Sequence, residues 1–342
     1  MNTTTNNGLS GLANLGNTCF MNSCIQVLSH TYELNNFLDQ TTYKTKLKNI
    51  GESALLVEWD NLRKMLWSKN QMVIPNQFVR TVQMVAAHKK IDIFTGFLQN
   101  DLSEFLLFII DCFHTSLSRE IKMTISGTPL NDTDKTAIQC FEMIKNMYSK
   151  DYSEVWNLFY AIHVSEITHF ETGVKISTTS EPYFMINLPI PVDNKSPSLI
   201  DCFNYYVEGE TINDWYNEET KETLIIQKKI QFWSLPPILV IDFKRFNNKA
   251  QKNQINITFP LENLDLSKYV IGYKKDSYKY ELYGVCNHSG GVMGGHYTSY
   301  VKNANGKWYH FNDTSVDEVS NPESTIISPK AYVLFYRKLK QM

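Results

Sequence analysis

The sequence lacks any hydrophobic run long enough to cross a membrane, because apolar stretches such as residues 105–110 are far shorter than the roughly 20 residues that a membrane helix needs. It has no basic run interleaved with aromatic residues, and its formal net charge of −2 does not favour nucleic-acid binding. Its polar start, Asn-Thr-Thr-Thr-Asn-Asn, lacks the apolar core of a secretory signal. We therefore expect a soluble intracellular protein that has neither a membrane nor a nucleic acid as its partner.

Cysteine is scarce, with 6 residues in a chain of 342, and none of them form a Cys-x-x-Cys pair. A chain of this length that is 43% hydrophobic and 20% charged can bury a large core without disulfides. We therefore expect free thiols and a reducing compartment, which is the cytoplasm or the nucleus.

Residues 11–22, GLANLGNTCFMN, form a glycine-punctuated loop followed by a predicted helix. Apolar residues recur at helical spacing after Cys19, which predicts a helix over residues 19–30 with one face packed inward. Asn17 or Thr18 can cap this helix. Cys19 then lies at the positive end of the helix dipole, where a thiolate is favoured over a thiol. Because a single cysteine is most often only a small core residue, this stretch does not define a nucleophile by itself.

A predicted hairpin near the other end of the chain carries a histidine next to an amide and a carboxylate. Residues 294–301 (GGHYTSYV) and 308–313 (WYHFND) flank an Asn-Ala-Asn-Gly sequence, and Asn-Gly between such runs is a strong hairpin signal. The two registers that we expect place His296 opposite Asn312 or opposite Asp313. Together with Cys19, this hairpin supplies the parts of a Cys-His-Asn/Asp thiol hydrolase.

These motifs resemble those of one family. Residues 11–22 match the pattern Gly-Leu-x-Asn-x-Gly-Asn-Thr-Cys-x-Met-Asn and resemble the cysteine box of the ubiquitin-specific proteases, the papain-like deubiquitinases. Residues 280–297 resemble the histidine box of that family, and residues 331–336 (AYVLFY) resemble its closing strand. The resemblance runs from Gly11 to about Tyr336 and implies a papain-like cysteine protease fold with a helical thumb and β-rich fingers and palm.

Helical periodicity dominates the first half of the chain, and strand patterns dominate the second. The apolar residues of 102–117 fit one helix stripe, and a short helix is expected near residues 141–147. From Val155 onward the chain is expected to be rich in strands, which we predict at residues 174–176, 184–188, 224–230 and 238–243. This pattern predicts an α+β fold with a cleft between the two halves. We expect a disordered tail at residues 1–8 and a single catalytic domain at residues 9–342, with the thumb at about 9–150 and the fingers and palm at about 151–342.

The resemblance implies a role for each residue of the site. Cys19 would attack the carbonyl of the C-terminal glycine of ubiquitin, and His296 would take the thiol proton. Asn312 matches the residue that orients the histidine, and Asp313 could supply a charge instead or as well. Adjacent strand residues point to opposite faces, so only one of the two can contact His296 without a bulge, and we favour Asn312. Asn14 matches the asparagine whose side-chain amide helps to form the oxyanion hole, although it could also serve only as a turn residue.

Residues 99–105, QNDLSEF, resemble the family motif Gln-x-Asp-x-x-Glu-Phe, whose aspartate helps to bind the C-terminal tail of ubiquitin. Asp101 is also a suitable N-cap for the helix that follows, and the two roles are compatible. Ser103 departs from the family, which usually has glutamine at this position. Gly295 and Tyr297 are further candidate substrate-binding residues. We expect Gly290-Gly291 and Gly294-Gly295 to form a mobile loop beside the site that lets a narrow Gly-Gly tail approach.

Many members of that family hold a structural zinc with two Cys-x-x-Cys pairs at the fingertips, and this sequence has neither pair. The matching positions fall near residues 169–172 (HFET) and 217–220 (NEET), where only His169 could ligate zinc. We expect no metal and no cofactor. The predicted function is a monomeric thiol deubiquitinase that acts on ubiquitin and ubiquitinated proteins. The alternatives are a catalytically weak ubiquitin-binding module and a peptidase for another ubiquitin-like modifier.

Overall fold

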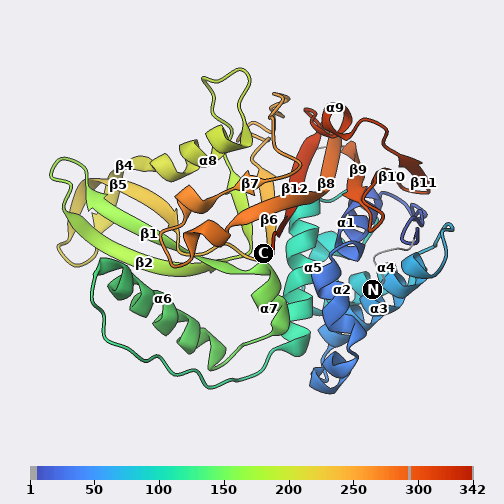
Figure 1. The fold of residues 1–342 in the computed structure, drawn as a ribbon, viewed down its shortest axis with the longest axis horizontal. Helices are drawn as coiled ribbons and strands as arrows, with labels where there is room; N and C mark the ends of the chain where they lie inside the picture. The colour runs from blue at the N-terminus through green and yellow to red at the C-terminus, as the bar shows by residue number, and fades with distance from the viewer. Residues whose placement is uncertain (1–5, 292–293, 341–342) are drawn as a thin grey trace.

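The computed structural model describes residues 6–291 and 294–340, with a group of helices on one side and two sheets on the other (Figure 1). The α-helices of the described residues are α1 (Cys19–Ser29), α2 (Tyr32–Asp39), α3 (Gly51–Ser68), α4 (Asn76–His88), α5 (Leu102–Leu117), α6 (Asp132–Tyr148), α7 (Glu154–Phe159), α8 (Leu199–Glu208) and α9 (Pro322–Ile326). Short 3₁₀ turns are η1 (Thr42–Lys46), η2 (Asp92–Phe94), η3 (Ser267–Tyr269) and η4 (Lys275–Ser277).

The larger sheet forms the palm and contacts the helical part of the molecule. Its strand order is β11-β10-β9-β8-β12-β6-β3, with β7 paired to β8, and only β3 and β6 run parallel among its described pairs. Its strands are β3 (Met185–Leu188), β6 (Ile238–Phe243), β7 (Leu264–Asp265), β8 (Lys279–Gly291), β9 (Gly294–Lys302), β10 (Trp308–Asn312), β11 (Ser315–Glu318) and β12 (Ala331–Lys338).

The smaller sheet forms the fingers and lies away from helices α1 to α5 (Figure 1). It has the order β2-β1-β5-β4, all antiparallel, with β1 (Ala161–His169), β2 (Lys175–Tyr183), β4 (Glu210–Asn217) and β5 (Glu222–Phe232). Helix α6 lies beside this sheet and packs Ala137 and Cys140 against Ile162, Val164 and Trp233. The strands predicted at 174–176, 184–188, 224–230 and 238–243 are confirmed as parts of β2, β3, β5 and β6.

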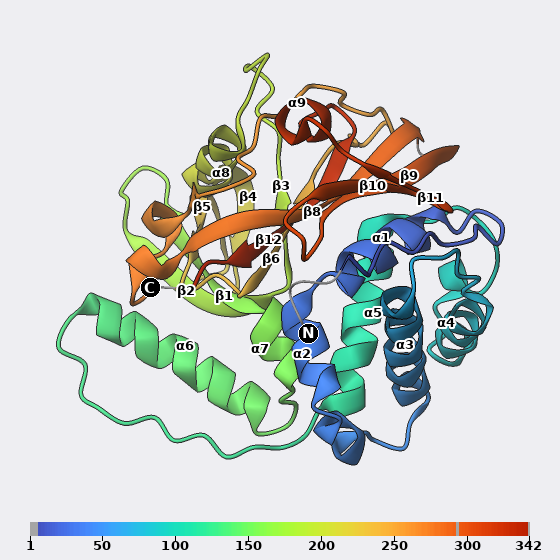
Figure 2. The ribbon, with the colours of Figure 1, turned by 45° about the vertical axis from the view of Figure 1, so that its right-hand side comes forward.

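Helix α1 is the centre of the core. Figure 2 shows it beneath β8, β9 and β10, and on its other side it packs against α5. All eleven of its residues are buried, so the prediction that only one face packs inward is wrong. The predicted helix stripe of α5 is confirmed, since its apolar residues are buried in the same core cluster. Helix α1 is therefore held from both sides by the two halves of the chain.

Helices α6 and α7 differ from their predictions, and in both an N-cap side chain marks the residue at which the helix begins. Helix α6 begins at Asp132, well before the predicted residues 141–147, and the Asn131 side chain accepts a hydrogen bond from the Asp134 N–H. Residues 154–159 form α7 rather than a strand, because the Ser153 side chain caps that helix. The first strand of the second half begins only at residue 161.

The disordered tail predicted at residues 1–8 is described only in part, since residues 1–5 lie outside the described residues. The remainder contacts the body of the protein. Asn70 donates a hydrogen bond to the Asn6 carbonyl at 2.6 Å, and Asn303 donates one to the Asn7 carbonyl at 3.2 Å. Residues 6–8 therefore belong to the folded chain, while the predicted boundaries near residues 9 and 150 stay predictions.

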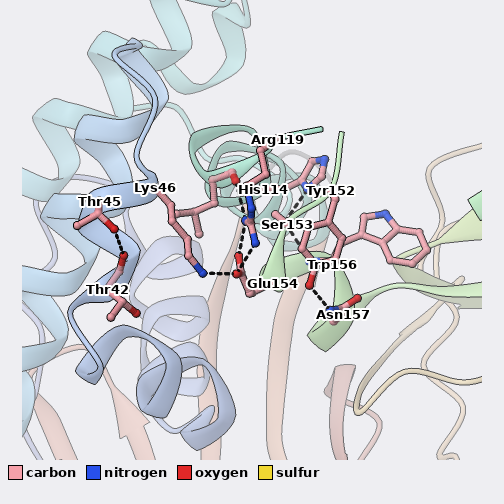
Figure 3. A network of polar contacts seen from close by, with 11 residues as sticks. Thr42, Thr45, Lys46, His114, Arg119, Tyr152, Ser153, Glu154, Trp156 and Asn157 are labelled. Carbon is pink, nitrogen blue, oxygen red and sulfur yellow. Dashed lines mark hydrogen bonds and ion pairs between the residues drawn. The ribbon is translucent and has the colours of Figure 1, made fainter. Parts of the chain in front are cut away.

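A polar network fastens the thumb to the start of the second half (Figure 3). Glu154, at the start of α7, accepts hydrogen bonds from both guanidinium nitrogens of Arg119, at 2.9 and 2.7 Å, and from Lys46 at 2.5 Å. Arg119 also pairs with Tyr152 through the backbone, and its guanidinium lies over the Tyr152 ring. This network brings together the two ends of the segment that carries α6 and fixes where α7 starts.

Candidate active site

The loop before Cys19 is tied to both halves of the protein. Its Gly11 and Ala13 pair with Val73 through backbone hydrogen bonds, and the Leu12 N–H donates to the Asp313 carbonyl at 2.8 Å. Asn17 has a φ of 55°, a left-handed conformation that asparagine tolerates better than most residues. The loop therefore reaches Cys19 along a fixed path.

Thr18 is the residue before α1, as predicted, but its side chain does not cap the helix. Its hydroxyl instead donates to the Asn14 side-chain oxygen at 3.3 Å and accepts from the Leu15 N–H at 2.9 Å. The first N–H groups of α1 are thus left without a side-chain cap from Thr18. Such N–H groups can stabilise negative charge at Cys19.

Cys19 is 2% exposed, beneath β9. Burial raises the pKa of its thiol, whereas the backbone N–H groups of Tyr297 and Phe20 lower it and the negative charge of Asp313 raises it again. The net effect is a raised pKa, so the prediction that the helix end favours a resting thiolate is wrong for this geometry. The thiol therefore needs a base to become a nucleophile.

His296 and Asn312 are in direct contact, with 2.6 Å between the His296 Nε2 and the Asn312 Oδ1. An amide oxygen only accepts hydrogen bonds, so this contact places the proton on Nε2 and leaves Nδ1 as the acceptor nitrogen of the neutral ring. That tautomer can take a proton from a thiol. Of the two candidates that the sequence left open, Asn312 is the one that contacts the histidine.

The register of the hairpin differs from both predicted registers. Ser299 pairs with Phe311, and Asn303 bonds through its N–H to the Lys307 carbonyl at 2.9 Å, so the two strands are offset by one or two residues from the predicted alignments. His296 therefore reaches Asn312 diagonally across the hairpin. Aromatic side chains are long enough for such diagonal contacts.

Asp313 lies just beyond β10, with a φ of 49°, and its side chain points toward the loop before Cys19. Its Oδ2 accepts from the Asn14 amide at 3.0 Å, and its Oδ1 accepts from the Asn22 amide at 2.8 Å. The side-chain oxygen of Asn14 accepts from the Gly16 and Thr18 N–H groups, both at 3.1 Å. One N–H of the Asn14 amide is thereby used on Asp313, and the second is left in a fixed orientation.

Asp101 caps α5, as predicted, through hydrogen bonds from the Ser103 and Glu104 N–H groups to its Oδ1 at 2.8 and 3.2 Å. Its Oδ2 accepts from the Tyr332 hydroxyl at 2.7 Å. Both carboxylate oxygens are therefore held in place at the N-terminus of α5. The second role expected for Asp101, binding of a substrate tail, stays a prediction.

The glycines expected to form a mobile loop belong largely to strands. Gly290 pairs with Gly295 and Gly291 pairs with Gly294 in the ladder between β8 and β9, while residues 292–293 lie outside the described residues. Tyr297 is 7% exposed, and its ring packs against Tyr332. It is a buried residue whose backbone N–H approaches the Cys19 sulfur.

Asn22 and Asp242 lie in this region but have no role predicted from the sequence. Asn22 follows Cys19 by less than one helical turn, so the two residues lie on the same side of α1. This spacing could have indicated that both lie near one residue, which is Asp313. Burial and, to a smaller extent, the negative charge of Asp101 raise the pKa of Asp242 to about 8. The Asp242 Oδ1 has no hydrogen-bond partner among the described residues. The feature of the sequence that could have marked Asp242 is its carboxylate within an otherwise apolar run, residues 238–243.

The fingertip positions matched to zinc ligands serve their own turns. The His169 Nδ1 accepts from the Thr172 N–H at 3.4 Å, and the Asn217 side-chain oxygen accepts from the Glu219 N–H at 2.9 Å. This histidine nitrogen and this amide oxygen are engaged in turn hydrogen bonds and do not fit a zinc site. Within residues 6–291 and 294–340, no cluster of three His, Cys, Asp or Glu side chains could hold a metal ion, and no helix is long and apolar enough to span a membrane.

A second group of residues has the composition of a catalytic triad but lacks its chemistry, and Figure 3 shows two of its members, His114 and Ser153. His114 lies 2.8 Å from the Ser153 Oγ and 3.3 Å from the Asp151 carboxylate. Ser153 is fully buried, and its oxygen accepts from the Trp156 N–H as the cap of α7. A hydroxyl that no substrate can reach is a structural group.

Comparison with known proteins identifies the family. A family model described as ubiquitin carboxyl-terminal hydrolase matches residues 10–336 of this chain. The chain belongs to the ubiquitin carboxyl-terminal hydrolase family. Its fold class, α+β and papain-like with a helical thumb and a β-rich second half, is the one predicted from the sequence, and it is confirmed.

Several ubiquitin carboxyl-terminal hydrolases are similar to this chain over most of its length. Ubiquitin carboxyl-terminal hydrolase 2 of Bos taurus is 33% identical over 98% of this chain and 56% of that protein. The enzyme of the same name from Gallus gallus is 34% identical over 96% of this chain and 93% of that protein. Ubiquitin carboxyl-terminal hydrolase 21 of Homo sapiens is 29% identical over 98% of this chain and 62% of that protein. The chain thus spans little more than half the length of the Bos taurus protein.

A solved structure has the same fold as this member of the family. It is described as the SAGA Ubp8/Sgf11/Sus1/Sgf73 DUB module bound to ubiquitin aldehyde, and its match has a TM-score of 0.73 with 23% identity. The match covers 98% of this chain and 70% of that chain. At this identity the likeness concerns the fold alone.

Proposed function

We propose that this protein is a cysteine-type deubiquitinase that hydrolyses the peptide or isopeptide bond after the C-terminal glycine of ubiquitin. The observation that carries the proposal is the meeting of three groups at one strand. Cys19 begins α1 beneath β9, the Tyr297 N–H of β9 approaches its sulfur, and His296 of β9 is oriented by Asn312. Membership of the ubiquitin carboxyl-terminal hydrolase family supports the choice of substrate.

The reaction begins with the thiol of Cys19, because its raised pKa keeps the proton on sulfur. His296 takes this proton at Nδ1 as the sulfur attacks the glycine carbonyl carbon. His296 then gives the proton to the leaving lysine amine as the C–N bond breaks. Water attacks the resulting thioester with His296 again as base, and the C–S bond breaks to regenerate the thiol.

The negative charge that develops on the carbonyl oxygen needs hydrogen-bond donors that are already in place. The backbone N–H of Cys19 and the second N–H of the Asn14 amide are the donors that we assign to it. Asp313 and Thr18 support this assignment, because they hold the amide of Asn14 through its other N–H and its oxygen. Asp101 supplies negative charge for the basic tail of ubiquitin.

The proposed partners are ubiquitin and ubiquitinated proteins, and the proposed working form is a monomer. The six cysteines are all free thiols, which is consistent with a reducing compartment such as the cytoplasm or the nucleus.

The deciding experiment is the reaction of the protein with ubiquitin that bears a C-terminal electrophile. We expect covalent labelling of the wild type and none of a folded Cys19→Ala variant. Wild-type protein that binds ubiquitin without labelling would instead be a catalytically weak binding module. Labelling by the electrophile of another Gly-Gly-tailed modifier, but not by that of ubiquitin, would assign a different substrate.

A further inference from the structure

A side-chain amide of the thumb is clasped by the palm strand that carries His296. The Gln99 Nε2 donates to the Gly295 carbonyl at 2.7 Å, and the Gly295 N–H donates to the Gln99 Oε1 at 2.7 Å. The two residues are 196 positions apart in the sequence. Gln99 lies in the loop between η2 and α5, so this clasp joins the thumb and the palm directly next to the histidine.

The clasp uses backbone groups that face the nucleophile. In an antiparallel ladder, the N–H and C=O of one residue point to the same edge of the strand, and residues two apart point to the same edge as each other. Gly295 directs both groups at Gln99, and Tyr297, two residues on, directs its N–H at the Cys19 sulfur. One edge of β9 therefore leads from Gln99 to Cys19.

That edge has no strand partner in the described part of the chain. The pairs between β9 and β10 run only from Ser299 to Lys302, so the stretch from Gly294 to Tyr297 pairs with β8 alone. An unpaired strand edge is a template for an extended peptide. The amide of Gln99 has the same donor and acceptor as one peptide group, and it occupies this template in the absence of a ligand.

We propose that Gln99 closes the site of the free protein by taking the place of a substrate peptide group at Gly295, and that the extended tail of the modifier must displace it to reach Cys19. This inference rests on the proposed function, because the tail is that of the Gly-Gly-ended substrate. At 3.3 Å per residue, a peptide group bound at Gly295 lies about two residues from Cys19. The clasp thus competes with the residue just ahead of the terminal Gly-Gly pair.

The clasp can open without unfolding the site. Gln99 and its partner atoms are exposed, and the loop is anchored independently by hydrogen bonds from Asn17 to the Phe97 carbonyl at 2.9 Å and from Gln83 to the Gly96 carbonyl at 3.2 Å. A rotation of the Gln99 side chain alone would free the edge of β9. The tail of the substrate must replace these two exposed, neutral hydrogen bonds. We therefore expect the clasp to weaken the apparent affinity for the substrate about three- to ten-fold.

The test compares Gln99→Ala and the isosteric Gln99→Met with a matched control, Gln83→Ala. The control removes a glutamine hydrogen bond from the same loop but leaves Gly295 untouched. Hydrogen exchange of the Gly295 N–H in the free protein reports on the clasp. Steady-state kinetics with ubiquitin that carries a C-terminal fluorogenic amide report on the competition.

We expect both Gln99 variants to speed exchange at Gly295 and to lower KM about three- to ten-fold with kcat within two-fold, while Gln83→Ala changes neither. An unchanged or higher KM, unchanged exchange, or the same fall in KM for Gln83→Ala would overturn the inference. Failure of the proposed function has a different signature. In that case the wild type and both Gln99 variants leave ubiquitin electrophiles unreacted, and the inference fails with it even if exchange at Gly295 responds.

Discussion

Asp313 hydrogen-bonds the side-chain amide of Asn14 at 3.0 Å, although 299 positions separate the two residues. The same carboxylate binds Asn22 on the nucleophile helix at 2.8 Å. Its neighbour Asn312 contacts His296. Two adjacent residues at the end of β10 therefore contact different parts of the candidate site: Asn312 holds the His296 ring, and Asp313 holds the loop and helix on either side of Cys19.

The first prediction concerns this carboxylate. Asp313→Asn keeps the size and the tolerance for positive φ, but its side chain has only one acceptor oxygen and cannot accept from both Asn14 and Asn22, so the Asn14 amide is held less firmly. We expect kcat to fall about ten-fold or more with little change in KM, because a misplaced oxyanion donor acts in the transition state. Loss of the negative charge near Cys19 also lowers the pKa of the thiol, and alkylation should then begin at lower pH.

Its control is Asp317→Asn, since Asp317 is exposed on β11 and binds only Ser315 among its described hydrogen bonds. A wild-type kcat for Asp313→Asn, or an equal loss for the control, would contradict the prediction.

A second prediction separates the orientation of the histidine from the stability of the fold. Asn312→Ala removes the acceptor for the His296 Nε2–H, so the ring loses its fixed tautomer. We expect kcat to fall about ten- to hundred-fold. Asn312→Asp should keep most of the activity, because a carboxylate oxygen accepts the same hydrogen bond. Asn312 is exposed, so the midpoint of thermal unfolding should stay unchanged in both variants, and an aspartate variant as slow as the alanine variant would argue against the role.

A third prediction divides the two roles of Asp101. Asn is as good an N-cap as Asp, so Asp101→Asn should keep the stability of α5 while removing the charge. We expect KM for ubiquitin substrates to rise with an unchanged unfolding free energy. Asp101→Ala should in addition lose about 1 kcal/mol of stability through the lost cap, measured by urea unfolding. If Asp101→Asn binds ubiquitin as the wild type does, Asp101 is a cap only.

A fourth prediction follows from the network of Figure 3. Hydrogen bonds from Arg119 and Lys46 outweigh burial and lower the pKa of Glu154 from 4.5 to about 2. The lowered pKa means that the folded state favours the ionised carboxylate. This contribution to stability is therefore complete above pH 4.5 and is lost as the pH falls towards 2.

Glu154→Gln should cost about 1–2 kcal/mol of unfolding free energy at pH 7, after allowance for solvent screening. The difference from the wild type should shrink as the pH falls from 4.5 to 2. Asp132→Asn is the control, because Asp132 pairs with Lys135 in full solvent and its loss should not matter. A difference that stays constant with pH would show that Glu154 acts through packing instead.

The local features of this protein could be predicted from the sequence because neighbouring residues determine them. The apolar stripe of residues 102–117 gives α5, the alternating runs of the second half give β2, β3, β5 and β6, and Asn-Gly gives the hairpin of β9 and β10. The order of residues 11–22 marks Cys19 as the start of a helix. Helix α7 and the true length of α6 were missed because their N-caps, Ser153 and Asn131, are short signals in polar surroundings.

The tertiary structure alone decided which distant groups meet. The hairpin register depends on the backbone of the turn, so only the structure shows that His296 reaches Asn312 diagonally while Asp313 turns to Asn14. The raised pKa of Cys19 comes from burial beneath β9, which outweighs the helix end that the sequence displays. The clasp between Gln99 and Gly295 likewise needs thumb and palm to be docked. Sequence patterns record short-range geometry, whereas contacts between residues hundreds of positions apart arise only when the core closes around α1.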